Sequence, residues 1–506
     1  MTQETAQALA YVKKVLAEAE MYLQAGRALM FDQETICPKK AMERQGEVAA
    51  FMDNKAFALI KDPDFEKAAL TLYERREELG EFDRVLAELL HRQYMKNKNI
   101  TPEKDLEYSL VFNKAFVDWN SARAASDFSL FASSLEKVEE VQKEMISLRE
   151  HEEGEEPLQL YDIMLDDYER GIRMADLDPI FAKCRERLGA LLEKICKSPK
   201  KIRTDFLSRP VTDAQQKELG EYLLNLMDFD FTRGAMTTTE HPFTEGIGPD
   251  DVRVTTHYYP DCFASSMYSV IHEGGHALFD MNQPRENFDS FITDGKTLGM
   301  HESVSRFYEN RIGRSREFIH YIYPELSRIM PQVTEGVTPD EMYEALNEVK
   351  PSLIRTEADD FTYTFHIIIR YELEKEIAQG TLKIADAPKR WRDKYAEILG
   401  IAPENDREGI LQDVHWSSGF GYFPTYAIGN FYNAMYYNRM KQEIDVPAAL
   451  SRGDLKPVNE WMKAHVFAKA DRLSPVEWIA DITGRKLTAD DFLDYLEEKY
   501  SAIYEL

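Results

Sequence analysis

Apolar side chains recur at the spacing of a buried helix face along much of the first 200 residues. Residues 5–29 and 81–95 both place apolar side chains at a period of about 3.6 residues. The segment 135–150 mixes apolar positions with charges of both signs, which is typical of a helix with one face in solvent. The apolar positions of the first two segments are Leu9, Val12, Leu16, Ala19, Leu86, Leu89, Leu90 and Tyr94. The pattern predicts a largely helical first 200 residues.

Strand signals are sparse, and the strongest covers residues 251–259. There β-branched and aromatic residues alternate with polar ones, between the turn-like segment 246–250 and Pro260. We expect a short strand or an edge hairpin, followed by a helix that resumes at about Ala264. The C-terminal third is expected to alternate helical stretches with aromatic-rich loops, notably over 415–437.

Charge and cysteine content narrow the choice of partners and compartment. The chain has 90 acidic residues against 62 Lys plus Arg, a formal net charge of -28. Such a surface repels nucleic acid and anionic lipid, so we expect neither as a partner. No apolar run approaches the ~18–20 residues of a membrane span, and the N-terminal segment has the wrong residues for a signal peptide. The four cysteines, Cys37, Cys184, Cys196 and Cys262, fit no zinc knuckle or disulfide framework. A cytoplasmic protein is expected.

The strongest chemical signal is the pentapeptide His272-Glu273-Gly274-Gly275-His276. On a helix, residues i and i+4 share a face, so His272 and His276 can both reach one divalent cation. Glu273 lies beside the first imidazole without being forced to bind, which suits it to take a proton from water. A chance match is the alternative. Each glycine inside a helix costs about 1 kcal/mol relative to alanine, so the close approach of another backbone or a substrate should offset that cost.

A catalytic zinc needs a third protein ligand and an open fourth position. Phe279 and Asn282 stand where a metzincin would have glycine and histidine, which excludes that class. A carboxylate from a second helix is expected instead. The downstream candidates are Asp280, Glu286, Asp289, Asp294 and Glu302. Glu302 is favoured because it lies in a well-marked helical segment, 298–313, although a plain salt bridge for Glu302 or a ligand role for His301 are alternatives.

Further motifs follow one another along the chain. They are Asp32-Gln33-Glu34-Thr35 with Pro38 after it, His241-Pro242-Phe243, Asp251-x-Arg253-x-Thr255, His301-Glu302-Ser303, Ile354-Arg355-x-x-Ala358-Asp359 and Gly409-x-x-Gln412-Asp413-x-His415-Trp416. Together with the pentapeptide, they resemble the Taq carboxypeptidase-type family of zinc metallocarboxypeptidases, distant structural relatives of angiotensin-converting enzyme and the neurolysin-like oligopeptidases. The resemblance runs through most of the chain. Val304, where glutamine is expected, and Gly274, where a side chain is expected, depart from the pattern without replacing a ligand.

The resemblance implies His272, His276 and Glu302 as zinc ligands and Glu273 as general base and acid. It implies a mainly α fold, with a large multi-helix body, a deep active-site groove and a small β-sheet. It also implies a homodimer that removes C-terminal amino acids from peptides with broad specificity. We therefore expect 1–506 to be a single catalytic unit. Its expected halves are a largely helical 1–200 and a metal-site half, 201–506.

Peptide hydrolysis also needs hydrogen-bond donors for the oxyanion of its tetrahedral intermediate. The segment 412–426 offers His415, Tyr422 and Tyr426. The resemblance implies that His415 and a tyrosine about ten residues later serve this way, with Tyr426 preferred over Tyr422. The alternative is that these rings pack in a core.

A carboxypeptidase must also bind a free C-terminal carboxylate, which a guanidinium does through a two-pronged hydrogen-bonded pair. The resemblance singles out Arg355 and Arg253, and it places His241 and Gln412 with them among the expected substrate-binding residues. The alternatives are a helical i,i+4 pair of Arg355 with Asp359 and an ordinary exposed charge for Arg253 on a strand edge.

Two other functions are alternatives to a carboxypeptidase. The same metal site would serve an endo-oligopeptidase, or a helical scaffold whose metal is structural, with His301 as fourth ligand. The same nitrogen and oxygen ligands accept Co²⁺ or Mn²⁺ as well as Zn²⁺.

Overall fold

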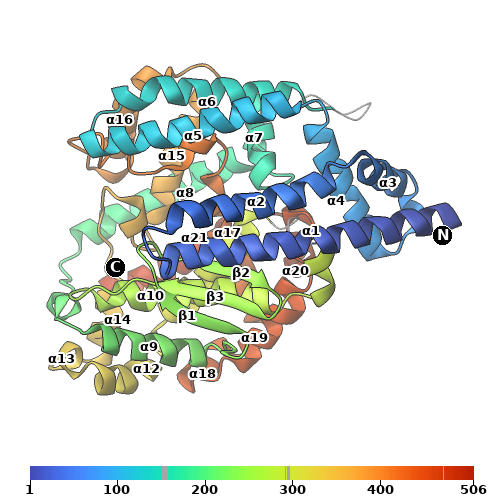
Figure 1. The fold of residues 1–506 in the computed structure, drawn as a ribbon. Helices are drawn as coiled ribbons and strands as arrows, with labels where there is room; N and C mark the ends of the chain where they lie inside the picture. Colours follow the sequence, from blue (N-terminus) through green and yellow to red (C-terminus); the bar gives the residue numbers. More distant parts are fainter. Residues whose placement is uncertain (151–157, 291, 293–296, 471) are drawn as a thin grey trace. The chain divides into compact units, whose positions relative to one another are not determined.

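Helices account for most of the chain in the computed structural model, which describes residues 1–150, 158–290, 292, 297–470 and 472–506 (Figure 1). This confirms the mainly α fold. The chain divides into two compact units: unit 1 comprises 1–92, 201–346 and 433–485, and unit 2 comprises 93–200, 347–432 and 486–506. Each unit thus contains segments from both of the expected halves, 1–200 and 201–506. That the whole chain acts as a single catalytic unit stays a prediction. Within the described residues, no helix is long and apolar enough to cross a membrane.

Unit 1 contains the small sheet and the HExxH helix. Its first part contains α1 (Gln3–Thr35), α2 (Met42–Ile60), α3 (Pro63–Glu74), the 3-10 segment η1 (Arg76–Glu78) and most of α4 (Glu81–Asn97). Its middle part contains η2 (Asp205–Ser208), α9 (Asp213–Leu226), β1 (Gly234–Thr238), β2 (Thr244–Gly248), β3 (Asp251–Thr256), α10 (Phe263–Met281), η3 (Arg285–Ser290), α11 (Leu298–Arg306), the π-helical η5 (Phe307–Gly313), α12 (Arg316–Ile329), α13 (Pro331–Thr334) and α14 (Pro339–Leu346). Its last part contains the second half of α17 (Pro424–Met440), α18 (Val446–Ser451), α19 (Lys456–Met462), the π-helical η9 (Lys463–Phe467) and α20 (Pro475–Thr483).

Unit 2 contains helices and no strand within its described residues. It contains the end of α4, α5 (Pro102–Ala125), α6 (Ser129–Ser147), α7 (Leu160–Tyr168), α8 (Met174–Lys197), η6 (Arg355–Glu357), α15 (Tyr363–Ala378), η7 (Ile384–Asp386), α16 (Ala387–Leu399), η8 (His415–Ser418), the start of α17 and α21 (Asp490–Tyr504).

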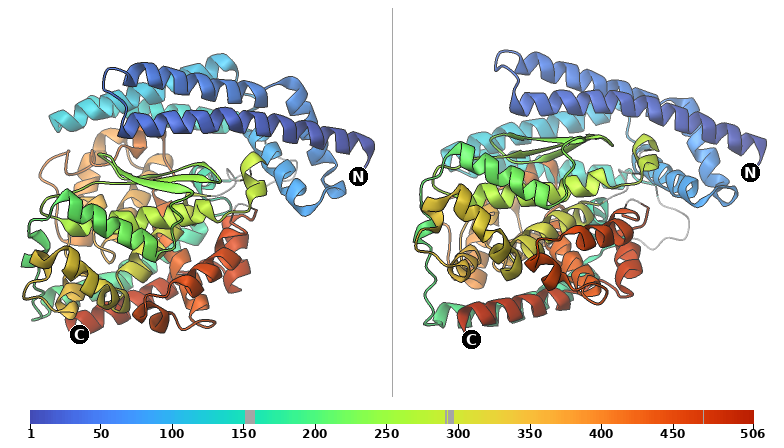
Figure 2. Two further views of the ribbon diagram at one scale, coloured as in Figure 1. Left: turned by 60° about the horizontal axis from the view of Figure 1, so that its bottom comes forward. Right: turned by 90° about the horizontal axis from the view of Figure 1, so that it is seen from below.

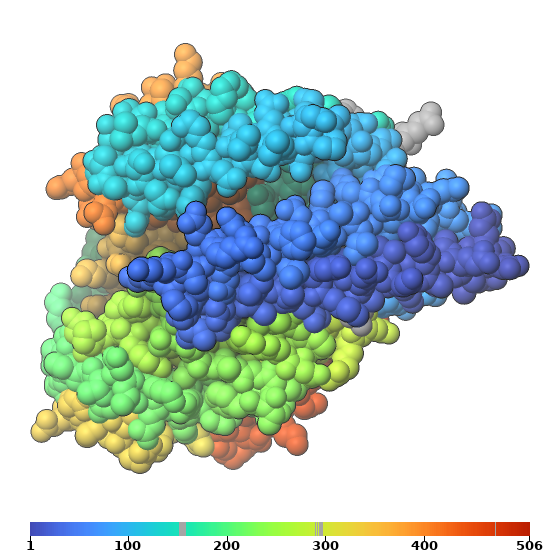
Figure 3. Space-filling view, in the orientation of Figure 1, coloured from blue at the N-terminus to red at the C-terminus, as the bar shows by residue number. Residues whose placement is uncertain are grey.

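The first two helices form an antiparallel hairpin in unit 1 (Figure 2). Their residues make a continuous ridge on the surface of that unit (Figure 3). Thr2 caps α1 by accepting a hydrogen bond from the Thr5 amide at 3.3 Å. The inner face of α1 packs with α3 and α4 in one apolar cluster, whose members include Leu9, Val12, Leu16, Phe65, Leu72 and Leu86. The helical period over 5–29 is therefore confirmed.

The predicted strand at residue 251 is the central one of a three-stranded sheet in the described residues, ordered β1-β3-β2. β1 pairs with β3 in parallel and β2 pairs with β3 antiparallel. The strand ends at Thr256 and not at Tyr259, because its partner β1 also ends at the pair Thr238–Thr256. Side chains alternate between faces of a strand, so the fully buried Val252 and Val254 share one face, which packs on α10.

The aromatic segment 415–437 differs from the predicted loop, because its second half belongs to α17. The helix is buried on all sides, so its sequence shows no alternation of apolar and polar faces that would predict it. The fully buried residues of this helix include Ala427, Ile428, Phe431, Tyr432, Met435 and Tyr436.

The approach of α11 to α10 depends on Gly275. A Cβ at Gly275 would lie 2.7 Å from the Ser305 Cα and 3.1 Å from the Val304 carbonyl oxygen. These are backbone atoms and cannot move aside independently. A Cβ at Gly274 would meet the flexible ends of Leu224 and Met227 instead, each at 2.9 Å. The close backbone contact expected from the two glycines is thus found at Gly275.

Gly275→Ala should therefore destabilise the protein by about 1–3 kcal/mol, the usual cost of overpacking. Gly274→Ala is the matched control: it should be neutral or raise stability by up to about 1 kcal/mol, the helix-propensity difference. Urea unfolding of both variants measures this. Equal effects of the two substitutions would contradict the assigned contact.

Candidate metal centre

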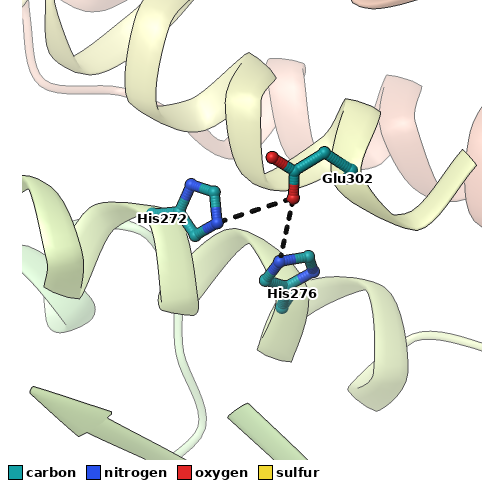
Figure 4. Close-up of side chains that lie close together, drawn as sticks. All are labelled: His272, His276 and Glu302. Carbon is teal, nitrogen blue, oxygen red and sulfur yellow. Dashed lines mark ion pairs between the residues drawn. The ribbon is translucent and has the colours of Figure 1, made fainter. Parts of the chain in front are cut away.

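Three side chains of unit 1 converge on one point (Figure 4). His272 and His276 lie one turn apart on α10, and Glu302 comes from α11. Glu302 Oε2 is 3.7 Å from His272 Nε2 and 3.6 Å from His276 Nε2, and the three ligand atoms lie within 4.8 Å of one another. A tetrahedral ion with bonds of about 2.0–2.1 Å separates its ligand atoms by about 3.3 Å, so these residues fit a divalent cation with little movement.

Glu309 fixes the orientation of the first imidazole. Its Oε2 lies 3.0 Å from Nδ1 of His272, so Nδ1–H donates to the carboxylate and Nε2 is directed toward Glu302. Glu309 lies two helical turns after Glu302, on η5, where Arg306 and Arg314 both approach it at 3.5 Å. A π-helical segment beside a functional site is a recurring arrangement.

Charges around the centre set the protonation of its groups. Burial would raise the pKa of Glu302, but His272, His276 and Arg306 hold it well below its usual range. The pKa of Glu309 falls to about 2, because Arg306 and His272 outweigh burial. Burial would lower the pKa of His272, yet Glu302 and Glu309 raise it to about 9. Metal binding must therefore displace a proton from His272.

The carboxylate of Glu302 is held on both oxygens. Arg306 Nε donates to Oε1 at 2.9 Å, and Ser305 Oγ donates to Oε2 at 3.2 Å. A carboxylate this buried needs such partners. The salt bridge considered as the alternative role of Glu302 is present, with Arg306. It involves only Oε1, and Oε2 faces the two imidazoles.

Glu273 lies beside the three converging groups but is not one of them within the described residues. It is 8% exposed. Thr244 Oγ1 lies 2.8 Å from its Oε2 and 2.9 Å from its backbone oxygen. A hydroxyl that can donate to either oxygen holds the carboxylate in place at the edge of the sheet.

Where their side chains are described, the other third-ligand candidates have other partners. His301 Nε2 is 3.2 Å from Asp280 Oδ1, and the His301 ring stacks on His276 at 4.3 Å between ring centroids. His301 thus supports the second imidazole and faces Asp280. Glu286 pairs with Arg472. Asp289 belongs to η3, and Asp294 lies outside the described residues.

Arg253 lies in the middle of the sheet and not on an edge strand. Its Nε and one terminal nitrogen donate to Asp251 at 2.8 and 2.7 Å, and its guanidinium lies 5.1 Å from the Phe31 ring centroid. Strand alternation puts it on the opposite face from Val254, which packs toward α10. His241 is exposed in the connection between β1 and β2.

In unit 2, Arg355 is buried and belongs to η6, so the helical pair with Asp359 is wrong. Asp359 instead accepts hydrogen bonds from the backbone amides around it. Arg355 Nε donates to Asp413 at 2.9 Å, and its backbone amide donates to Gln412 at 2.8 Å. The fully buried Arg370 pairs with the same Asp413. Two guanidiniums thus share the carboxylate of Asp413.

His415 belongs to a chain of donors in unit 2. Its Nε2 is 3.2 Å from Tyr426 Oη, which lies 3.3 Å from Tyr422 Oη. Burial is the main reason that the pKa of His415 falls to about 4; Asp413 opposes this shift, and Arg355 and Arg370 add to it. The ring is therefore neutral at pH 7. Phe423, by contrast, packs in the core.

Sequence reasoning missed Glu309, Thr244 and Arg370. The position of Glu309, seven residues after Glu302 and therefore on the same helix face, was a readable signal. Thr244 and Arg370 are far in sequence from their partners, and nothing in local spacing marks them.

Comparisons with known proteins agree along nearly the whole chain. The family model described as "Carboxypeptidase Taq (M32) metallopeptidase" matches residues 11–500. "Carboxypeptidase 1" of Bacillus subtilis is 36% identical over 97% of this chain and 98% of its own length. "Thermostable carboxypeptidase 1" of Thermus thermophilus is 34% identical over 95% of each chain. The crystal structure of the M32 carboxypeptidase from Deinococcus radiodurans R1 is 30% identical, covers 100% of both chains and has a TM-score of 0.93.

Divalent cation binding to the metal-free protein should release about one proton at pH 7.5, because the pKa of His272 is about 9. Calorimetry in buffers of different ionisation enthalpy measures the number. In Glu309→Gln the number should fall, since one of the charges that raise this pKa is gone. Binding without proton release would contradict the arrangement.

The same pKa determines how the stability of the metal-free protein changes with pH. Protonated His272 stabilises the metal-free fold fully below an ordinary histidine pKa of about 6.5. That contribution is lost as pH rises through about 9.

Proposed function

Because this chain belongs to the carboxypeptidase Taq (M32) metallopeptidase family, we propose that it holds a zinc ion with His272, His276 and Glu302 and releases single amino acids from peptide C-termini with broad specificity. Metallocarboxypeptidase activity on peptides and a divalent metal follow from the family, which confirms the resemblance inferred from the motifs and decides against a helical scaffold. The convergence of two imidazoles and one carboxylate is the observation that carries the zinc assignment.

Zinc suits this set of ligands best. Two nitrogens and one oxygen around an open fourth position are typical of catalytic zinc sites, and the same set accepts Co²⁺ or Mn²⁺. When bound, zinc would polarise the scissile carbonyl and make water a stronger nucleophile. The buried carboxylate of Glu302 and the hydrogen bond between His272 and Glu309 support this proposal.

Glu273 is proposed as general base and then general acid. It would take the proton of the attacking water and pass it to the nitrogen of the leaving amino acid. Two features support this role: the carboxylate neighbours His272 without joining the ligand set, and Thr244 restrains it by a hydrogen bond. A restrained carboxylate keeps its geometry through both proton transfers.

Arg355 is proposed to recognise the free C-terminal carboxylate, with Gln412 holding its backbone. The pairing of two guanidiniums with the single carboxylate of Asp413 supports this proposal. His415 is proposed as a neutral donor to the oxyanion, with Tyr426 preferred over Tyr422 as its companion, and the hydrogen-bonded chain of the three supports it.

Arg253 and His241 are proposed to contact more distant parts of the peptide. Arg253 is paired with Asp251, but 32% of its side chain is exposed. Its guanidinium can therefore donate further hydrogen bonds to a peptide.

The working form is proposed to be a cytoplasmic homodimer in which 1–506 acts as a single catalytic unit. The family resemblance supports the dimer. The four free cysteines support a reducing compartment.

Glu273→Gln should keep the metal and lose about 10²–10⁴-fold in kcat, the usual contribution of a general base. Metal content by mass spectrometry and hydrolysis of a peptide measure both effects. The exposed Glu218 offers a matched control, since Glu218→Gln should change neither. Wild-type turnover in a metal-loaded Glu273→Gln protein would remove Glu273 from its role.

One peptide with a free and with an amidated C-terminus separates exopeptidase from endopeptidase. The free peptide should give a mass ladder at least about 10-fold faster than the amide, because a charge-assisted hydrogen bond is lost in the amide. Arg355→Met should narrow this ratio, whereas Arg311→Met, which removes another buried guanidinium, should not. Equal cleavage of both peptides by the wild type would defeat the assignment.

A further inference from the structure

The segment 413–422 of unit 2 joins η8 to α17 through a turn that needs glycine. It carries His415 in η8 and then turns at Gly419 and Gly421, whose φ angles are +115° and +103°. These values lie in the region that favours glycine. A Cβ at Gly421 would lie 2.4 Å from the Met164 carbonyl oxygen, so the turn is pressed against α7. Neighbouring elements must therefore supply the contacts that fix it.

Glu374 of α15 is fully buried and meets this segment twice. Its Oε1 accepts a hydrogen bond from Trp416 Nε1 at 2.7 Å, and its Oε2 accepts one from the Gly421 amide at 3.0 Å. Tyr161 Oη donates to the same Oε2 at 2.7 Å. The Trp416 and Gly421 nitrogens can only donate. A carboxylate satisfies all three groups, whereas an amide would turn its own NH₂ toward at least one of these donors.

Arg370 lies one helical turn before Glu374 on the same face of α15. It is fully buried, and its Nε and a terminal nitrogen donate to Asp413 Oδ2 at 2.7 and 2.5 Å. One face of α15 thus binds the chain at two points: Arg370 pairs with Asp413, two residues before His415, and Glu374 accepts a hydrogen bond from Trp416, one residue after it. Arg370 and Asp413 are charged groups buried together, and such groups are costly unless they are fully paired. Burial raises the pKa of Glu374 to about 7, and its three hydrogen-bond donors favour the carboxylate form.

A third contact fixes the turn between the glycines. Gln142 of α6 donates to the Phe420 carbonyl oxygen and accepts from the Phe420 amide, both at 2.9 Å. The backbone of the segment is therefore bound on three sides, and its conformation is determined before any substrate arrives.

We propose that Arg370 and Glu374 are positioning residues that hold His415, and with it the tyrosines that follow, in the geometry needed for hydrolysis. The inference rests on the proposed role of His415 as a donor. Neither residue needs to touch the peptide, since each acts through the segment 413–422. Oxyanion donors lower the activation barrier only when they are held in advance at the right place. Loss of the contact made by Arg370 or Glu374 should therefore reduce kcat and leave KM nearly unchanged.

Glu374→Gln is the direct test, with Glu372→Gln as the matched control. Glu372 lies on the same helix but pairs with Arg185 and Lys394. Glu374→Gln should lower kcat about 10–100-fold, as expected for a misplaced donor, and change KM by no more than about twofold. Glu372→Gln should leave both kcat and KM unchanged. Deuterium exchange of the peptide 413–422 should be faster in Glu374→Gln alone. An unchanged kcat would overturn the proposal.

A double-mutant cycle with His415→Ala decides whether the effect passes through His415. If it does, Glu374→Gln costs much less activity in the His415→Ala background than in the wild type, because only the tyrosines remain to be misplaced. The same loss in both backgrounds would overturn the proposal, whereas full activity of His415→Ala itself would show that the proposed function had misassigned His415. Should Glu374→Gln fail to fold, Tyr161→Phe removes one donor and should show the same pattern with a smaller loss.

Discussion

The metal centre depends on how closely the backbone of α11 approaches α10. Gly275 has no side chain, so the backbone of Val304 and Ser305 can lie directly against it. That approach brings the carboxylate of Glu302 within 3.7 Å of the two imidazoles presented by α10. The five-residue motif supplies two ligands at one helical turn, and its second central glycine makes room for the third.

A balanced set of buried charges then fixes the centre. Glu302 and Glu309 are two carboxylates on one helix face, and Arg306 and Arg314 lie between and beside them. The two acids raise the pKa of His272 to about 9, so in the absence of metal a proton occupies the place of a cation. Metal binding would replace that proton with a divalent cation, which adds one net positive charge beside the two carboxylates.

The parts readable from the sequence are those that repeat over short distances. Helical periodicity predicted α1 and α4, and the i,i+4 spacing predicted the shared face of His272 and His276. The well-marked helical segment around Glu302 placed that residue correctly on a second helix. Partners far apart in the chain were not readable: Arg355 binds Asp413 and not the nearby Asp359. The helix from Pro424 was missed because burial on all sides erases its period.

The most direct test of the account is the anomalous scattering of a crystal of the zinc-loaded protein, measured on both sides of the zinc absorption edge. We expect one strong peak bounded by His272 Nε2, His276 Nε2 and Glu302 Oε2, with a fourth position that no side chain fills. A peak at another place, a centre without zinc, or a fourth protein ligand closing the site would contradict it.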